Sequence, residues 1–372
     1  MQIRLCFHIK LDCQHRGSML LLLNSKRTTL HDIAKRLGVS HTTVALALKN
    51  HHRISLERRK EVQRMAKKMG YHPDPFLSGL AAYRKRHGSA KFQGVIGWIN
   101  HWNQPSRMRQ FREFDDYWHG TKKAAERFGY KLEEIPWSKD CSAKRFEKIL
   151  LTRGVQGVLV PPHHEIIDWG DFDWSKFSVI RFGMSVQNPD SNLVSADHFR
   201  AVTMAVQRIS EYGYQRIGLI AGEAYNQKLG GGFVGGFCHA QIMLKFNPAL
   251  PPLLTDYGTR DSGGMMRQKQ ALRQWLAAHK ADAVLTTDME IPGLIRELGH
   301  RIPQDIAVAG TSISDIPVDA GINQHSKAIG TIALEMLAKQ INVSERGEPS
   351  NPCRILVEST WQDGKSLPRR RP

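Results

Sequence analysis

Three side chains that can form hydrogen bonds, His41, Thr42 and Thr43, follow directly after the tripeptide Gly38-Val39-Ser40. An imidazole or a hydroxyl can bond to base edges or phosphates, and a threonine methyl can pack on the methyl group of thymine. Because these side chains are short, they let a backbone approach its partner closely. The cluster therefore has the chemistry of a nucleic-acid contact, provided that the surrounding elements present it on a surface.

The stretch around this cluster, TLHDIAKRLGVSHTTVALAL, predicts two short helices joined by a turn. Apolar residues recur at helical spacing at positions 30, 33, 34 and 37, and Gly38 stands where a helix C-terminus favours glycine. Ser40 can cap a second helix that buries Val44, Ala47 and Leu48. Such a pair is either a helix-turn-helix unit, whose second helix enters the major groove, or an ordinary helical hairpin of a core.

A third helix is expected from about Ser55, which can cap LERRKEVQRMAKKMG, to a stop at Gly70. YHPDP at 71–75 breaks this pattern, and PFLSGLAAYRKRHG predicts one more short helix with a basic end. From Lys91 onward, apolar runs such as GVIGWIN, VQGVLVP and RIGLIAG alternate with helical patterns over about 270 residues, enough for two parallel sheets. The expected fold class is an N-terminal all-α helix-turn-helix headpiece followed by a two-lobed α/β body.

Lys and Arg outnumber Asp and Glu by 53 to 35 in this chain of 372 residues, and the formal charge of +18 favours nucleic acid or an anionic membrane surface as partner. The five cysteines form no C-x-x-C pair, which argues against a disulfide framework or a zinc ribbon. The longest apolar run, MLLLL at 19–23, is too short for a membrane span or a signal-peptide core, so we expect a cytoplasmic protein. The first 18 residues show no sustained period, and we expect the native start at or near Met19.

Other motifs offer weaker chemistry. His163-His164-Glu165 lacks the H-E-x-x-H spacing of a metal site and is typical of a polar loop. The residues Gly230-x-Gly232-x-x-Gly235 satisfy the dinucleotide-binding formula, but the preceding strand RIGLIAG already ends at residue 222. No G-x-S-x-G, Walker lysine loop or nucleophile with an evident base is present. We therefore expect no enzyme, no cofactor and no metal.

Residues 29–84 resemble the DNA-binding headpiece of the lac-repressor (LacI/GalR) family of transcriptional regulators. The family pattern T-L-x-D-[VI]-A-x-x-[AL]-G-V-S-x-x-T-V is met without a gap by TLHDIAKRLGVSHTTV. RIS at 53–55, the Arg-rich third helix and GYHP at 70–73 also agree, and Leu80 stands where the family inserts a leucine into DNA. The α/β body extends the resemblance over nearly the whole chain after residue 28.

The resemblance implies a homodimer that acts on a pseudo-palindromic double-stranded operator, most simply as a repressor. The recognition helix, 41–49, would lie in the major groove, and paired hinge helices would enter the minor groove, where Leu80 would wedge between base pairs. A core leucine of a linker helix is the alternative for Leu80. The residues implied in DNA binding are Thr29, Leu30, Ser40, His41, Thr42, Thr43, Ala45, Leu46, Lys49, Arg53, Ser55, Leu77, Leu80 and Ala81.

The chain departs from the family in its recognition helix, where Ala45 and Leu46 stand in place of a common Ser-Arg pair. An arginine that could bind guanine through two hydrogen bonds is therefore missing. Leu46 suits contact with a thymine methyl, and Lys49, one turn later, can reach a phosphate. The DNA sequence of the half-site therefore cannot be inferred from relatives.

In this family the body resembles a periplasmic binding protein, and a small effector between the lobes couples their closure to the hinge helices. The residues implied in effector binding, at the carboxyl ends of strands, are Trp102, Arg181, Phe233, Asp288 and Gln324. Thr287-Asp288 replaces the usual Asn-Asp, and Gly310-Thr311-Ser312 replaces Gly-Phe-Asp. A carbohydrate is one effector class, but at least two of its expected donors or acceptors are missing, which leaves a different ligand, or none, open.

The expected boundaries are an N-terminal extension at 1–27 that is disordered or not native, a helix-turn-helix domain at 28–73, and a hinge helix with linker at 74–90. The effector-binding and dimerisation body follows at 91–361, with lobe one about 91–195 plus 323–345 and lobe two about 196–322 plus 346–361. A basic tail at 362–372 ends the chain. The alternative to a regulator is a sugar-type binding receptor without a DNA role, which would lack salt-dependent duplex binding.

Overall fold

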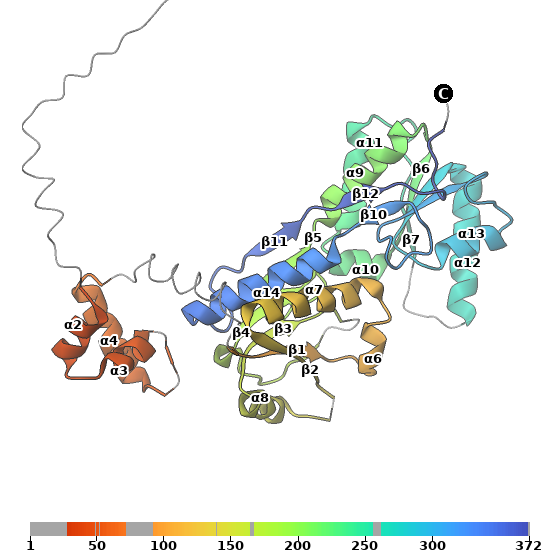
Figure 1. Ribbon diagram of the computed structural model, residues 1–372. Helices are drawn as coiled ribbons and strands as arrows, with labels where there is room; N and C mark the ends of the chain where they lie inside the picture. Colours follow the sequence, from red (N-terminus) through yellow and green to blue (C-terminus); the bar gives the residue numbers. More distant parts are fainter. Residues whose placement is uncertain are drawn as a thin grey trace, which may run out of the picture. The chain divides into compact units, whose positions relative to one another are not determined.

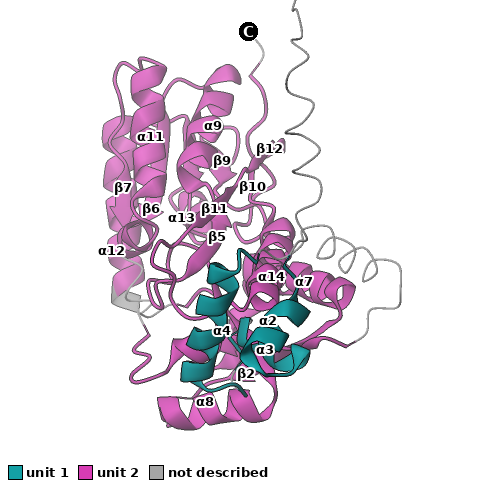
Figure 2. Ribbon diagram, turned by 90° about the vertical axis from the view of Figure 1, so that its left-hand side faces the viewer, with its two compact units in different colours: residues 1–84 teal, residues 85–372 magenta. Residues whose placement is uncertain are grey.

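The computed structural model describes residues 28–48, 50–51, 53–71, 92–138, 140–163, 167–255 and 262–370. The chain divides into two compact units, residues 1–84 and residues 85–372, which are coloured separately in Figure 2. The expectations for the N-terminal extension, the hinge helix with Leu77, Leu80 and Ala81, and Lys49 lie outside the described residues.

The described residues of the first unit form three helices, α2 (Leu30–Leu37), α3 (His41–Leu48) and α4 (Leu56–Lys68). Their apolar faces meet in a small core in which Ile33, Val44, Ala47 and Val62 have no exposed surface. This core matches the apolar spacing of the sequence, because positions three and four apart lie on one face of a helix. The three predicted helices of the headpiece are confirmed.

The first lobe of the body is a six-stranded parallel sheet in the order β11-β5-β4-β3-β1-β2 (Figure 1). Its strands are β1 (Gly94–Asn100), β2 (Tyr130–Pro136), β3 (Val155–Val160), β4 (Ser178–Phe182), β5 (Asn192–Ala196) and β11 (Arg354–Val357). The helices α7 (Arg112–Phe128) and α14 (Ser326–Val343) pack on one face. The other face is covered by α8 (Ala143–Thr152) and the segment around the short helix η3 (Trp174–Lys176), while α6 (Pro105–Met108) precedes α7.

The second lobe is another six-stranded sheet, in the order β12-β10-β9-β8-β6-β7. Its strands are β6 (Ile217–Gly222), β7 (Leu253–Thr255), β8 (Ala283–Thr286), β9 (Ala307–Gly310), β10 (Gly321–Asn323) and β12 (Thr360–Gln362). The helices α9 (His198–Glu211) and α11 (Gly232–Met243) cover one face, and α12 (Ser262–His279) and α13 (Ile291–Glu297) cover the other. The short α10 (Glu223–Lys228) follows β6, and β12 runs antiparallel to β10, so this sheet is not wholly parallel as expected.

The expected lobe boundaries need one correction near the C-terminus. We expected residues 346–361 in lobe two, but β11 pairs with β5 in the first sheet, in the register Arg354 to Leu193. The chain therefore crosses between the lobes three times, after β5, after β10 and between β11 and β12. The strands β11 and β12 are short and follow each other closely in the chain. Their sequences therefore do not indicate which sheet each strand joins.

The expected basic tail at 362–372 is also corrected, because residues 363–370 dock on the second lobe. Leu367 has no exposed surface and belongs to the core that α9 and α11 form. Arg370 forms an ion pair with Asp282 at 2.8 Å and lies over the ring of Tyr214 at 4.1 Å. Burial of Leu367 and the contacts of Arg370 together anchor this part of the chain.

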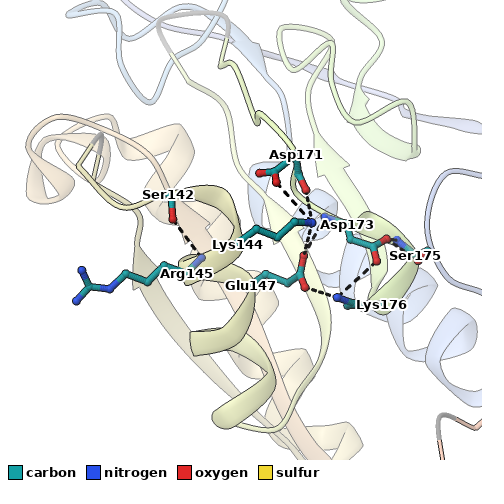
Figure 3. A network of polar contacts seen from close by, with 8 residues as sticks. All are labelled: Ser142, Lys144, Arg145, Glu147, Asp171, Asp173, Ser175 and Lys176. Carbon is teal, nitrogen blue, oxygen red and sulfur yellow. Dashed lines mark hydrogen bonds and ion pairs between the residues drawn. The ribbon is translucent and has the colours of Figure 1, made fainter.

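A buried carboxylate on α8 organises a network of polar contacts in the first lobe (Figure 3). Glu147, only 5% exposed, forms an ion pair with Lys176 and accepts a hydrogen bond from the backbone N–H of Asp173 at 3.1 Å. Lys144 lies 3.6 Å from the same carboxylate. Burial alone would raise the pKa of Glu147, but the hydrogen bonds from Lys176 and Asp173 outweigh it and lower the pKa. The network joins α8 to η3 and serves the architecture of this lobe.

We expect Glu147→Gln to lower the free energy of unfolding by about 1 to 2 kcal/mol, because the buried hydrogen bonds lose their charged acceptor. Since folding lowers the Glu147 pKa, its contribution is present above the unfolded-state pKa and is lost as the pH falls. Urea denaturation at neutral and acidic pH measures both effects. Glu211→Gln is the matched control, since Glu211 pairs with Arg208 on the surface and should contribute little. Equal stability of the two variants would contradict the prediction.

Candidate nucleic-acid interface

The first helix of the pair, α2, is fixed at both ends by local contacts. The Thr29 hydroxyl accepts a hydrogen bond from the backbone N–H of Asp32 at 3.3 Å, and the Asp32 carboxylate accepts one from the Thr29 N–H at 2.8 Å. At the other end Gly38 adopts a φ of 63°, a conformation that favours glycine. Leu30 is half-buried against the core. This reciprocal capping sets where the turn to α3 begins.

The second helix, α3, presents its first residues to solvent. His41 and Thr42 are exposed, whereas Val44 and Ala47 have no exposed surface. The Ser40 hydroxyl accepts a hydrogen bond from the Thr43 N–H at 3.0 Å, which caps the helix. The core thus holds α3 from behind, and its exposed N-terminal side chains can contact a partner.

Two further residues of α3, Ala45 and Leu46, are half-buried. The hydroxyls of Ser40 and Thr43 lie 2.8 Å apart and are hydrogen-bonded to each other. These two hydroxyls are therefore positioned before any partner binds.

The loop after α3 is held by a contact that sequence reasoning missed. Asn50 has a φ of 51°, its backbone carbonyl accepts a hydrogen bond from Arg59 at 3.1 Å, and its side-chain oxygen accepts one from Gln63 at 2.7 Å. Arg53 is exposed, and the Ser55 hydroxyl caps α4 by accepting from the backbone N–H of residue 58 at 3.3 Å. Asparagine tolerates positive φ better than most residues, which is the only local signal of this turn.

The headpiece is strongly basic. Residues 28–71 contain ten Lys and Arg against three Asp and Glu. Lys60, Arg64 and Lys67 are exposed on α4. Positive charge of this density attracts the phosphates of a duplex and supplies binding that does not depend on sequence.

In the body, the predicted effector residues of the first lobe lie at the carboxyl ends of its strands. The Trp102 indole N–H donates to the carbonyl of Pro162 at 3.0 Å, and its ring lies 5.8 Å from that of Phe111. Arg181 is 5% exposed, and its guanidinium donates to the carbonyls of residues 186, 187 and 191 and to the Asp190 carboxylate. These bonds engage each of its nitrogens and hold the loop after β4.

The remaining three predicted effector residues are buried in the second lobe. Phe233 packs against His198, with ring centroids 4.9 Å apart, and burial lowers the pKa of this histidine to about 4. Asp288 accepts a hydrogen bond from Gln268 at 2.6 Å, and Gln324 donates one to the carbonyl of Thr311 at 2.9 Å. Each of these contacts lies within one lobe, so they do not join the five predicted residues into one constellation.

A contact between the lobes, which was not predicted, lies at the start of α7. Asp315, in the second-lobe loop between β9 and β10, accepts hydrogen bonds from the backbone N–H groups of Arg112 at 2.7 Å and Glu113 at 3.4 Å. Glu113 accepts a further bond from the Tyr117 hydroxyl at 2.8 Å. Burial, followed by repulsion from Asp315, raises the pKa of Glu113 from 4.5 to about 7. Sequence patterns cannot pair positions 203 residues apart, which explains why this cluster was missed.

Within the described residues no group of His, Cys, Asp and Glu side chains could hold a metal ion. No helix in the described parts of the chain is long and apolar enough to cross a membrane.

A capped helix-turn-helix domain with an exposed second helix, followed by a body of two α/β lobes, defines a DNA-binding transcription regulator. Residues 29–74 match the family described as "Bacterial regulatory proteins, lacI family". The chain is 25% identical over 350 residues to the HTH-type transcriptional regulator CelR of Thermobifida fusca, covering 90% of this chain and 96% of that protein. It is 22% identical over 358 residues to the HTH-type transcriptional regulator GntR of Escherichia coli K12, covering 93% and 100%.

Solved structures of transcriptional regulators share the fold, as two examples show. The structure of a transcriptional regulator CelR–cellobiose complex has a TM-score of 0.55 at 21% identity, covering 91% of this chain and 100% of that one. The lac repressor dimer bound to operator and the anti-inducer ONPF has a TM-score of 0.52 at 17% identity, covering 92% and 99%. Residues 29–74 are therefore a lacI-family DNA-binding domain, and the chain as a whole is similar to transcriptional regulators.

Proposed function

We propose that the protein is a repressor that binds a pseudo-palindromic operator as a homodimer, with α3 in the major groove. The observation that carries this proposal is the exposure of His41 and Thr42 at the start of α3, while Val44 and Ala47 hold the helix on the core. The N-terminal residues of a recognition helix are the ones that reach base edges. As a regulator of bacterial transcription, it would act in the cytoplasm, where the genome lies.

The DNA contacts divide by chemistry. His41 and Thr42 would contact bases, with Ala45 and Leu46 at the edge of the groove. Polar or charged residues around the pair would contact phosphates, namely Thr29, Ser40, Thr43, Lys49, Arg53 and Ser55, while Leu30 supports the start of α2. Leu77, Leu80 and Ala81 would form the minor-groove contact of the hinge helix, a role that rests on the family resemblance alone.

We further propose that a small molecule between the two lobes regulates DNA binding. Support comes from the two-lobed body and from the cellobiose bound to the related CelR structure, which makes a carbohydrate the first class to screen. Trp102, Arg181, Asp288 and Gln324 lie at or near the carboxyl ends of strands, where such a ligand would bind, and Phe233 lies in the first turn of α11. A ligand changes DNA binding only if it prefers one lobe arrangement.

The test of DNA recognition is selection of duplexes from a random library by the full-length protein, followed by affinity measurements over a range of salt. A palindromic consensus is expected, with log affinity falling by about 0.9 per phosphate contact for each log unit of salt. The alternative function, a sugar-type receptor without a DNA role, predicts weak binding and no consensus. Weak binding without a consensus, both in the presence and in the absence of candidate ligands, would refute the proposal.

Leu46 offers a test of which α3 residues reach the bases. It replaces an arginine that relatives commonly have, and it is half-buried at the edge of α3. Leu46→Arg is expected to add a preference for guanine at one half-site position, because the guanidinium can bind two acceptors of guanine. Repeating the library selection with this variant measures the change. An unaltered consensus would show that residue 46 does not reach the base edges, and Leu46→Lys controls for added charge.

A further inference from the structure

The two lobes meet at the first turn of α7, where the helix lacks internal partners. The backbone N–H groups of Arg112 and Glu113 are the first two of the helix, and such groups have no acceptor within it. Their acceptor is the carboxylate of Asp315, which belongs to the other lobe. A negative charge also interacts favourably with the positive end of the helix dipole. This contact therefore exists only while the lobes are together.

Glu113 lies beside this contact and is 7% exposed. Its carboxylate accepts a bond from the Tyr117 hydroxyl at 2.8 Å and has a hydrogen bond with Ser312 of the second lobe. The charged groups that act on it are Asp315 and Asp116, and Asp116 is paired with Lys327 of α14 at 3.3 Å. Arg112 faces Asp315, and Tyr225 of the second lobe acts on Tyr117. Two carboxyl groups thus come close in a buried place, which disfavours charge on both.

We propose that Asp315 and Glu113 form a proton-dependent latch between the lobes, in which Asp315 holds the start of α7 and closure takes up a proton at Glu113. The inference rests on one part of the proposed function, the opening and closing of the lobes. It deepens that function, because effector binding at this body would then depend on pH even for a ligand without charge.

The sign of the effect follows from proton linkage. When the lobes separate, Glu113 meets water and regains an ordinary pKa, whereas in the closed arrangement burial and Asp315 raise its pKa to about 7. Between these values the closed arrangement binds more protons, so it is favoured at lower pH and loses this advantage as the pH rises through 7. From pH 6 to pH 8 the closing equilibrium should fall about tenfold.

The experiment is hydrogen–deuterium exchange of the full-length protein at pH 6 and pH 8, read at the N–H groups of Arg112 and Glu113 and corrected for the intrinsic effect of pH. Protection of these two groups should fall about tenfold in the wild type over this range. In Glu113→Gln the two amides should stay protected at both pH values. In Asp315→Ala they should lose their protection at both pH values. Asp115→Asn, on the outer face of the same turn and paired with His119, should behave as wild type. Small-angle scattering of the same samples reports lobe separation.

Equal protection at the two pH values in the wild type would overturn the latch, and so would an undiminished pH dependence in Glu113→Gln. If Asp315→Ala fails to fold, as judged by circular dichroism, Asp315→Asn takes its place, with partial loss expected. Because the readout is a backbone group of the body, failure of the latch leaves operator binding untouched. Failure of operator binding, in turn, does not change the exchange of these two amides.

Discussion

Replacing both His41 and Thr42 by alanine is expected to weaken binding to the selected operator by about 10²- to 10³-fold. Each contact of this kind with a base contributes about 1 to 3 kcal/mol of discrimination, and both side chains are exposed at the start of α3. Binding to an unrelated duplex should change little, because it depends on phosphate contacts. The measurement is a pair of titrations, one with the operator and one with a scrambled sequence of equal length.

The control for this variant replaces the same residue types in the body, Thr152→Ala with His300→Ala. The headpiece should stay folded in the test variant, because its core comprises Ile33, Val44, Ala47 and their neighbours and neither changed side chain belongs to it. An unchanged slope of log affinity against log salt would show that phosphate contacts survive. If the double variant bound operator and scrambled duplex with wild-type affinities, α3 would not be the reading element.

Replacing Gly330 by alanine is expected to be the most destabilising single change proposed for the body. The helices α7 and α14 lie side by side (Figure 1), and the Thr121 hydroxyl donates to the carbonyl of Gly330 at 3.1 Å. A Cβ atom at residue 330 would lie 2.2 Å from the Tyr117 carbonyl oxygen, a distance that requires the helices to separate. Forced repacking of this kind costs about 3 kcal/mol or more, since both helices cover the core of the first lobe.

Urea denaturation of the full-length variant checks this expectation. Gly293→Ala is the matched control, because Gly293 lies within α13 and a Cβ atom there meets no other atom within 4 Å. That control should be neutral or stabilise the protein by about 1 kcal/mol through helix propensity. A Gly330→Ala variant as stable as the Gly293→Ala variant would mean that α7 and α14 are not packed this closely.

The headpiece could be predicted from sequence because its contacts are local. Spacing of the apolar residues gave its helices, and Thr29, Gly38 and Ser55 mark their ends through chemistry that involves only near neighbours in the chain. The alternation of strands and helices in the body could be predicted for the same reason. Its family pattern then placed His41 and Thr42 at the start of the reading helix, where the structure shows them exposed.

Features that depend on distant contacts could not be predicted. The guanidinium of Arg181 binds the loop that follows β4, a contact that depends on how that loop folds back. Asp315 and Glu113 become a pair only after two sheets are assembled, and nothing near either residue indicates it. Leu367 stands among basic residues that stay exposed, and nothing in the local sequence indicates that this one leucine joins the core of the second lobe.

The crossings between the lobes determine when each part of the body can be completed during synthesis. On one face of the first sheet α7 packs without its neighbour α14 until residues 326–343 have been made, and the edge strand β11 follows only at residues 354–357. A ribosome that has produced three quarters of the chain therefore carries a nascent first lobe with part of one apolar face open to solvent. The core of the headpiece lies within residues 30–71, so it can close as soon as these residues have been made. We expect chains that stall before residue 326 to need a chaperone for the first lobe, because its apolar surface is not yet fully covered.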